Sequence, residues 1–151
     1  MGIIGYDEKS GKPILMDPRE FKVRYRSSLG SLEKYYKELE VGRVVAVKCK
    51  ECGSKYFPPR SYCPSCGSQD LEFFVLSSRG RLITYTEINV KPQTHSKYGD
   101  YIVGVVEVDG VKVVGHVKAK FKDLRPDQNV EIKVERREGD EYPRIVFKPL
   151  D

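Results

Sequence analysis

The four cysteines of this chain are the residues whose types and spacing could do chemistry. They form two pairs at C-x-x-C spacing, Cys49 with Cys52 and Cys63 with Cys66, and a glycine follows each pair. Two thiolates at this spacing lie on one tight turn and can bind the same ion, and a second such turn completes a tetrahedron. Glycine adopts the positive φ of such a turn at low cost. The spacing therefore predicts a tetrathiolate metal site.

A metal held by four sulfurs has no position left for water or substrate, so we expect a structural ion and not a catalytic one. Zinc is favoured by this ligand set, and iron fits the same cage. Two disulfides would need an oxidising compartment, and we expect none because the first residues contain no apolar signal segment. A redox C-x-x-C usually stands alone, whereas this motif is doubled.

Composition and charge exclude several classes of protein. The chain has 151 residues, of which 32% are charged and 39% hydrophobic, and no apolar run has the length that crosses a bilayer. Four thiolates around a divalent ion carry a net charge of about −2, which brings the formal +5 of the chain to about +3. This mild charge allows an anionic partner without requiring nucleic acid. We expect a cytoplasmic protein with no membrane partner.

The sequence contains no set of residues that makes a catalytic centre. Its two histidines, His95 and His116, fall in a polar loop and in a predicted strand, and no serine or free cysteine is left to act as a nucleophile. There is no Walker loop and no G-x-G-x-x-G. We interpret His116 as a strand residue and expect no catalytic residues.

Basic residues near aromatic rings are the remaining candidates for chemistry. Arg81 follows a glycine at a strand turn, and Lys91 and Lys97 lie on either side of His95 in a polar loop that also contains Tyr98. Cations beside exposed rings suit a phosphate-bearing ligand with a planar base. Lysine also covers the solvated faces of most folds, and this alternative stays open. We therefore take Arg81, Lys91 and Lys97 as candidate ligand-binding residues.

The elements that must position these residues begin with an N-terminal extension. Residues 1–16 are polar, and we expect them to be loose or draped on a partner. Asp17-Pro18-Arg19-Glu20 is typical of a helix start and predicts a short helix that runs to about Ser28.

A second helix is predicted from Ser31, which would cap it, to Gly42, which would end it. Four apolar residues at helical spacing form one stripe on this helix: Leu32, Tyr35, Tyr36 and Leu39. The stripe either packs on this protein's own core or docks on another protein, and the sequence leaves both possibilities open.

The sequence after Gly67 is rich in strands. We expect Asp109-Gly110 to form a type I′ hairpin and Gly115 to mark a bulge or sharp bend. The strands are expected at 73–77, 81–90, 101–108, 111–119, 130–134 and 145–147. In the second of these strands, alternate residues should share one side, namely Leu82, Thr84, Thr86, Ile88 and Val90. Such a series of short antiparallel strands suits a small closed barrel of the OB type better than a sandwich.

The order of these parts resembles a known two-domain family over nearly the whole chain. This is the zinc-ribbon plus OB-fold family long catalogued as a domain of unknown function and widespread in archaea and bacteria. Its most specific piece is the Pro-Pro-Arg that precedes C-P-x-C. The matching segments are Tyr36 to Val47, Phe57 to Gly67, Arg79 to Thr86, Tyr101 to Val108 and Phe147 to Pro149.

We therefore expect a mainly β protein with two short N-terminal helices, a rubredoxin-like zinc ribbon and a C-terminal OB-fold barrel. The expected parts are an N-terminal extension over residues 1–47, the zinc ribbon over 48–70 and the barrel over 71–151.

The resemblance also implies a function. Members of this family are linked to thiolases and hydroxymethylglutaryl-CoA synthases, and archaeal members are similar to bridging subunits of such an assembly at the head of the mevalonate pathway. There the barrel helps to bind coenzyme A or an acyl-CoA, while the partner enzymes do the chemistry. Some relatives pair with thiolase-like proteins of lipid or steroid degradation. Only the four ribbon cysteines carry over residue by residue.

The resemblance thus implies a non-catalytic, acyl-CoA-binding accessory subunit. The alternative is a nucleic-acid-binding module, because ribbons and OB barrels also serve that role and the isoelectric point is near 8.9. Against this alternative, the exposed sides of the predicted strands lack the alternation of aromatic and basic residues that makes a stacking platform.

Overall fold

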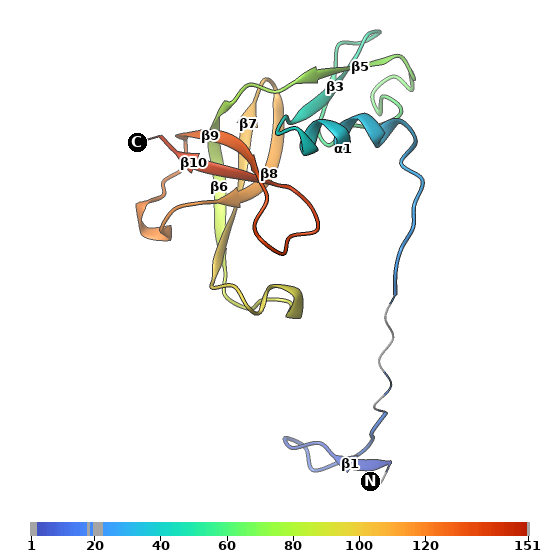
Figure 1. Ribbon diagram of the computed structural model, residues 1–151, viewed down its shortest axis with the longest axis vertical. Coiled ribbons are helices and arrows are strands. Elements are labelled where there is room, and N and C mark those ends of the chain that lie inside the picture. The colour runs from blue at the N-terminus through green and yellow to red at the C-terminus, as the bar shows by residue number, and fades with distance from the viewer. Residues whose placement is uncertain (1–2, 18, 20–22, 151) are drawn as a thin grey trace.

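The computed structural model describes residues 3–17, 19 and 23–150, with Thr94 described by its backbone alone. It contains a small N-terminal hairpin, a three-stranded sheet with one helix, and a closed barrel (Figure 1). The strands are β1 (Ile4–Tyr6), β2 (Pro13–Leu15), β3 (Val45–Cys49), β4 (Lys55–Tyr56), β5 (Leu71–Val75), β6 (Arg79–Ile88), β7 (Tyr101–Val108), β8 (Val111–Val117), β9 (Gln128–Glu135) and β10 (Arg144–Pro149). The helices are α1 (Glu33–Glu40) and three 3₁₀ turns, η1 (Gly30–Leu32), η2 (Gln93–His95) and η3 (Phe121–Asp123).

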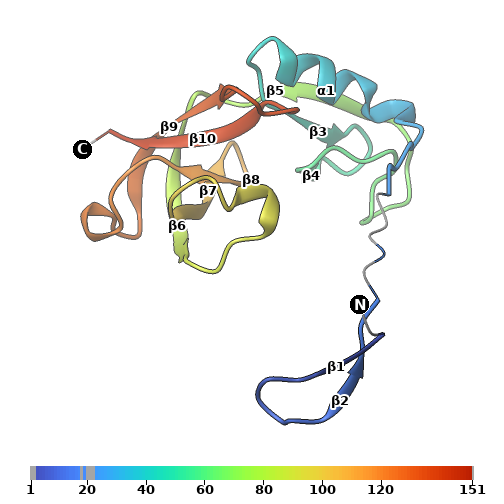
Figure 2. The same cartoon turned by 60° about the horizontal axis from the view of Figure 1, so that its bottom comes forward.

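The N-terminal extension is more ordered than the sequence suggested. Strands β1 and β2 pair antiparallel, and the Asp7 carboxylate accepts hydrogen bonds from both the N–H and the hydroxyl of Ser10 at 2.7 Å in the connecting turn. Asx turns of this kind stabilise tight connections locally. In both views the hairpin lies away from the ribbon and the barrel (Figures 1 and 2).

The first predicted helix is wrong for the residues that the structure describes. Residues 23–29 have no regular structure, and residues 18 and 20–22 of the prediction lie outside the described part of the chain. The Asp17 carboxylate accepts hydrogen bonds from the N–H and guanidinium of Arg19, and the first of these is the bond that an N-cap residue makes. No helix in the described residues is long and apolar enough to cross a membrane.

The second predicted helix is present as η1 followed by α1, although Ser31 makes no capping hydrogen bond. Gly42 ends it as predicted: its φ is +84° and its N–H donates to the Leu39 carbonyl at 3.0 Å. Some residues of the apolar stripe pack on this protein's own core, and one is exposed and available to another protein. Leu39 is buried and Tyr35 packs against the same core, while the ring of Tyr36 is 43% exposed.

The sheet that carries the cysteines has the order β4-β3-β5. Its central strand β3 pairs antiparallel with β5, with Val47 opposite Phe73 and Cys49 opposite Leu71. The strand predicted at 73–77 is therefore shifted by two residues and belongs to the ribbon sheet, not to the barrel. Its apolar residues form a strand, as expected, but pairing between distant segments decides which sheet it joins.

The barrel closes in the order β10-β8-β7-β6-β9, and β9 also pairs with β10, as in an OB-fold (Figure 1). The predicted hairpin at Asp109 and Gly110 is confirmed, because both residues have positive φ, +50° and +84°, as a type I′ turn requires. Not all pairs are antiparallel, since β10 runs parallel to β8 with Val146 opposite His116. A connection through β9 makes this parallel pairing possible.

The bulge expected at Gly115 and the common side expected for alternate residues of β6 were both wrong. Gly115 lies in regular register opposite Gly104, without a bulge. A Cβ on Gly115 would lie 2.9 Å from the Phe147 ring, so close packing explains the glycine. The irregularity falls instead between Leu82 and Thr84. Because a bulge reverses the alternation, Leu82 is buried while Thr84 is exposed, and the predicted common side does not exist.

Candidate metal centre and barrel cleft

The four cysteines converge on one site, as the spacing predicted. Their sulfur atoms all lie within 4.8 Å of one another, with Cys49 and Cys66 3.6 Å apart and Cys52 and Cys63 3.5 Å apart. Cys49 and Cys63 are buried, and Cys52 and Cys66 are exposed, so each knuckle contributes one inner and one outer ligand.

The two knuckles have the same backbone design. In the first, the Gly53 N–H donates to the Cys49 carbonyl at 2.9 Å, and in the second the Gly67 N–H donates to the Cys63 carbonyl at 2.8 Å. The two glycines have φ of +74° and +75°, which a side chain would disfavour. The Gly-Ser that follows each second cysteine thus turns both sulfurs of a pair toward the same point.

The donor set fits zinc. Four thiolates at about 2.3 Å from a tetrahedral ion would lie about 3.8 Å apart, close to the sulfur separations of 3.5 and 3.6 Å. Protein sulfur would occupy every position, so the ion stabilises the turn structure and offers no site to a substrate. The four cysteines therefore form a structural zinc site, as expected.

Neighbouring groups shift the pKa values of the thiols in opposite directions. The Tyr56 hydroxyl lies 3.4 Å from the Cys63 sulfur and lowers the pKa of that thiol to about 6. The Ser68 N–H lowers the pKa of the Cys66 thiol, but lost hydration and the adjacent Cys49 sulfur outweigh it and raise the pKa to about 12. Without a cation one sulfur thus keeps its proton, which a bound zinc ion would displace.

The Pro-Pro-Arg segment has a structural role beside this site. The guanidinium of Arg60 lies 5.8 Å from the centroid of the Tyr56 ring, and the Tyr56 hydroxyl is 2.7 Å from the Ser65 hydroxyl. Tyr56 therefore connects this segment to the second knuckle.

The structure does not bring the three candidate ligand-binding residues together. Arg81 lines a cleft of about 720 Å³, but its guanidinium is bound by Glu107 at 3.2 Å and Asp127 at 3.0 Å. It lies near the start of β6, and that strand extends for roughly 20 Å before the loop that carries the two lysines begins. Lys91 pairs with Asp100 at the other end of that loop and so holds its two ends together.

Lys97, the third candidate, lines a different cleft of about 500 Å³ between two loops of the barrel. Residues 89–100 connect β6 to β7 on one side, and residues 136–143 connect β9 to β10 on the other. The Lys97 ammonium lies 5.0 Å from the centroid of the Tyr98 ring. His116, on the outer face of β8, forms part of the same wall.

Sequence reasoning missed the two arginines of this cleft, Arg137 and Arg144. They flank a charged turn that the sequence analysis did not consider as a site, and the Asp140 side chain between them is only 13% exposed. The signal that could have found them is the fold itself, because OB barrels bind ligands between the loops that join strands one to two and four to five. In this chain those loops are 89–100 and 136–143.

Two family descriptions match the chain in tandem. Residues 37–72 match the rubredoxin-like zinc ribbon domain of ChsH2, and residues 75–135 match its C-terminal OB-fold domain. These ranges contain all four cysteines and most of the barrel.

Curated relatives cover about two thirds or more of the chain. A "DUF35 domain-containing scaffold protein" of Methanocaldococcus jannaschii is 30% identical over 116 residues, which are 72% of this chain and 82% of that protein. A protein of the same description from Pyrococcus furiosus is 32% identical and covers 64% of this chain and 69% of its own length. The "benzoylsuccinyl-CoA thiolase subunit BbsA" of Thauera aromatica is 31% identical, covering 67% of this chain and 71% of that subunit.

Solved structures share the fold. The structure described as "Ltp2-ChsH2(DUF35) aldolase" includes a chain that superposes with a TM-score of 0.69 at 21% identity, over 80% of this chain and 94% of that one. A DUF35-family protein of unknown function from Sulfolobus solfataricus gives a TM-score of 0.55 at 15% identity, over 78% of this chain and 83% of its own.

Proposed function

We propose that this chain is a non-catalytic accessory subunit of a thiolase-type enzyme assembly. The chain belongs to the ChsH2 (DUF35) family of zinc-ribbon and OB-fold proteins, and the proposal starts from this membership. The observation that carries the proposal is the similarity to proteins described as a scaffold and as a thiolase subunit. The closed zinc site agrees with such a role, since it stabilises a fold and leaves no open position for chemistry.

An accessory subunit needs a surface for its partner, and the N-terminal part of the chain offers one. Large apolar side chains are exposed along the extension, at Ile3, Ile4, Tyr6, Leu15, Met16, Val23 and Tyr25. Exposed apolar side chains gathered in this way mark interaction sites in soluble proteins. On α1, Tyr36 is a further large apolar residue that is 43% exposed. We infer that the partner enzyme contacts the extension and α1.

The finer assignment follows the family resemblance. The partners would be a thiolase and a hydroxymethylglutaryl-CoA synthase, the pathway would be the mevalonate pathway in the cytoplasm, and the barrel would bind coenzyme A or an acyl-CoA shared with the partners. Arg81, Lys91 and Lys97 remain the residues proposed from the sequence for the ligand. Lys97 is the best placed of them, because Arg81 and Lys91 are already engaged by carboxylates.

The proposal includes the absence of catalysis by the isolated chain. All four cysteines lie together in the zinc site, where each sulfur would be a ligand of the ion and not a free nucleophile. Thioester chemistry would therefore be left to the partner enzymes.

Nucleic-acid binding is the alternative, and the basic and aromatic cleft between the two barrel loops is the observation that favours it. Bound nucleic acid in the purified protein, removed at high salt, would support this alternative.

Co-purification tests the proposed function. The tagged chain, produced in its native cells, should retain a thiolase-type enzyme, and Tyr36→Glu should release it while the variant stays folded. Val114→Glu is the matched control, because Val114 is an exposed apolar residue of the barrel strand β8. Retention of no thiolase-type enzyme by the wild-type chain would contradict the proposal, and unfolding of the Tyr36 variant would assign that ring to the core.

A further inference from the structure

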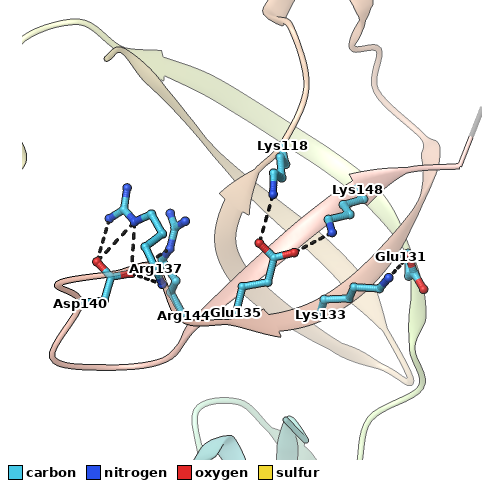
Figure 3. Close-up of polar contacts among 8 residues, drawn as sticks. All are labelled: Lys118, Glu131, Lys133, Glu135, Arg137, Asp140, Arg144 and Lys148. Atoms are coloured by element: carbon cyan, nitrogen blue, oxygen red, sulfur yellow. Dashed lines mark hydrogen bonds and ion pairs between the residues drawn. The ribbon is translucent and has the colours of Figure 1, made fainter. Parts of the chain in front are cut away.

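Two arginines in the cleft between the barrel loops, Arg137 and Arg144, both contact the carboxylate of Asp140. Asp140 lies 3.1 Å from Arg137 Nε and 3.4 Å from Arg144 Nε, as the dashed lines in Figure 3 show. The Arg144 Nε is buried and has no hydrogen-bond partner of its own, because the contact with Asp140 is too poorly aligned to count as one. A buried N–H without an acceptor is costly, and a bound anion would supply the acceptor.

Further cations lie beside this pair. Lys97 lines the same cleft, and Lys118 and Lys120 line an adjoining cavity of about 420 Å³ that shares His116 and Arg144 with it. Glu135 contacts Lys118 at 3.4 Å and Lys148 at 2.6 Å, so this carboxylate, like that of Asp140, forms ion pairs with two cations (Figure 3). The local surplus of positive charge also acts on His116: burial lowers its pKa, and Arg144 and Arg137 lower it further.

A row of aromatic rings forms the wall next to these cations. Arg137 Cζ lies 3.8 Å from the centroid of the Tyr98 ring, which is 6.0 Å from the ring of His95. The row continues from His95 to Tyr101 at 5.5 Å and from Tyr101 to His116 at 5.2 Å. Planar rings beside guanidinium groups bind a planar base and its phosphates at the same time.

We propose that this cleft, with Arg137, Arg144 and Lys97 as phosphate ligands and the ring of Tyr98 as a stacking surface, binds the nucleoside-phosphate end of a small ligand. A volume of about 500 Å³ is within the range of small-molecule sites. A phosphate bound between the two loops accepts a hydrogen bond from the buried Nε of Arg144 and takes the place of Asp140 on Arg137, whose Nε and Nη2 donate to that carboxylate in the absence of ligand. Asp140 then holds the arginines in place in the absence of ligand. Coenzyme A carries such an end, and its identification as the ligand rests on the proposed function.

Titration of the zinc-loaded full chain with adenosine 3′,5′-bisphosphate, followed by calorimetry, tests the site. We expect binding with a dissociation constant of about 1 mM or tighter. Arg137→Gln and Arg144→Gln should each weaken it at least about tenfold, and added salt should weaken it as well. Lys133→Gln is the control, since Lys133 lies on β9 and pairs with Glu131 outside the cleft. Because Arg144 is partly buried, the exposed Lys97 provides an independent variant, Lys97→Gln, that does not endanger the fold.

The outcomes separate this site from the proposed function. Equal affinity in all three cleft variants, or no binding by the wild-type chain, overturns the site even if a thiolase co-purifies. Binding of adenosine 3′,5′-bisphosphate together with coenzyme A supports the site and its ligand. Binding of the bisphosphate without coenzyme A supports the site and contradicts coenzyme A as the ligand. Much tighter binding of a single-stranded oligonucleotide than of the mononucleotide would overturn a small-molecule site in favour of nucleic acid.

Discussion

Lys55 of the zinc ribbon and Asp109 of the barrel are joined directly: the Lys55 ammonium donates a hydrogen bond of 2.9 Å to the Asp109 carbonyl. The Asp109 carboxylate also accepts from the N–H of Ser77 at 2.6 Å and from its hydroxyl at 2.9 Å. Ser77 lies in the segment that connects β5 to β6, so one hairpin turn holds both the ribbon and its link to the barrel.

Replacement of Asp109 should therefore cost stability. Asp109→Ala loses two hydrogen bonds and places alanine at a φ of +50°, and we expect the free energy of unfolding to fall by about 1–3 kcal/mol. Asp109→Asn keeps an acceptor oxygen and tolerates positive φ, so its loss should be under about 1 kcal/mol. Urea denaturation followed by circular dichroism measures both. Equal losses in the two variants would show that the side-chain acceptor does not matter.

Removal of zinc should unfold the ribbon before the barrel. Zinc supplies on the order of 10–16 kcal/mol to small tetrathiolate and related sites, whereas the barrel has its own buried core. We expect one zinc per chain by elemental analysis. After chelation, amide NMR signals of residues 45–75 should collapse while those of β6 to β10 persist.

The control for this experiment is Ser65→Ala, which removes a hydroxyl beside the site but no ligand, and should retain zinc. A protein produced with zinc available but containing no tightly bound metal would contradict the assignment. Persistence of the ribbon signals after complete chelation would show that the ion is not structural.

The close contact between Gly115 and Phe147 makes a steric prediction. Gly115→Ala places a methyl group 2.8 Å from the Ile145 carbonyl oxygen and 2.9 Å from the Phe147 ring, and overpacking of this kind costs about 1–3 kcal/mol. Gly99→Ala is the control, because Gly99 has open space around its Cα and no positive φ, and its change should stay within about 0.5 kcal/mol. Thermal denaturation of the two variants compares them. An unaffected Gly115 variant would mean that β8 and β10 are not packed as described.

The lowered pKa of His116 predicts a loss of stability in mild acid. Burial, then Arg144 and Arg137, lower this pKa from its ordinary value of 6.5, so between the two values the unfolded chain binds more protons than the folded one. The free energy of unfolding should therefore fall as the pH falls through 6.5 toward the folded pKa, and stay unaffected by this group above that window. His116→Gln should remove this part of the pH dependence.

Histidine NMR titration provides the direct check. A His116 resonance that titrates above 6.5 in the ligand-free protein would contradict the surplus of positive charge in the cleft. Bound phosphate should shift the titration upward, because it neutralises the arginines.

Features encoded by neighbouring residues could be predicted from the sequence, whereas features created by distant contacts could not. The cysteine knuckles and the Asp109-Gly110 hairpin depend on spacing and on backbone preference within a few residues. The assignment of β5 to the ribbon sheet depends on its pairing with β3, which the apolar run at Phe73 does not specify. The bulge between Leu82 and Thr84 has no local glycine to reveal it.

The same distinction applies to the barrel cleft. Lys97 could be selected from the sequence because it lies beside aromatic residues, but Arg137, in a loop 40 residues further along the chain, and Arg144, at the start of β10, reach it only after the barrel closes. Arg81 looked equivalent to Lys97 in the sequence, and only the fold shows that two carboxylates already bind it. The helix expected from Asp17 is absent from residues 23–29, although the Asp17 carboxylate accepts a hydrogen bond from the Arg19 N–H as an N-cap residue would.

The most direct test of the accessory role is the mass and the activity of a reconstituted complex. The purified chain should be mixed with the thiolase encoded in the same genome and analysed by size-exclusion chromatography with light scattering, alongside thioester turnover assays of each component. We expect one co-eluting species whose mass includes both proteins, and no thiolase, synthase or thioesterase turnover by the isolated chain. Separate elution at all concentrations, or turnover by the pure chain alone, would contradict it.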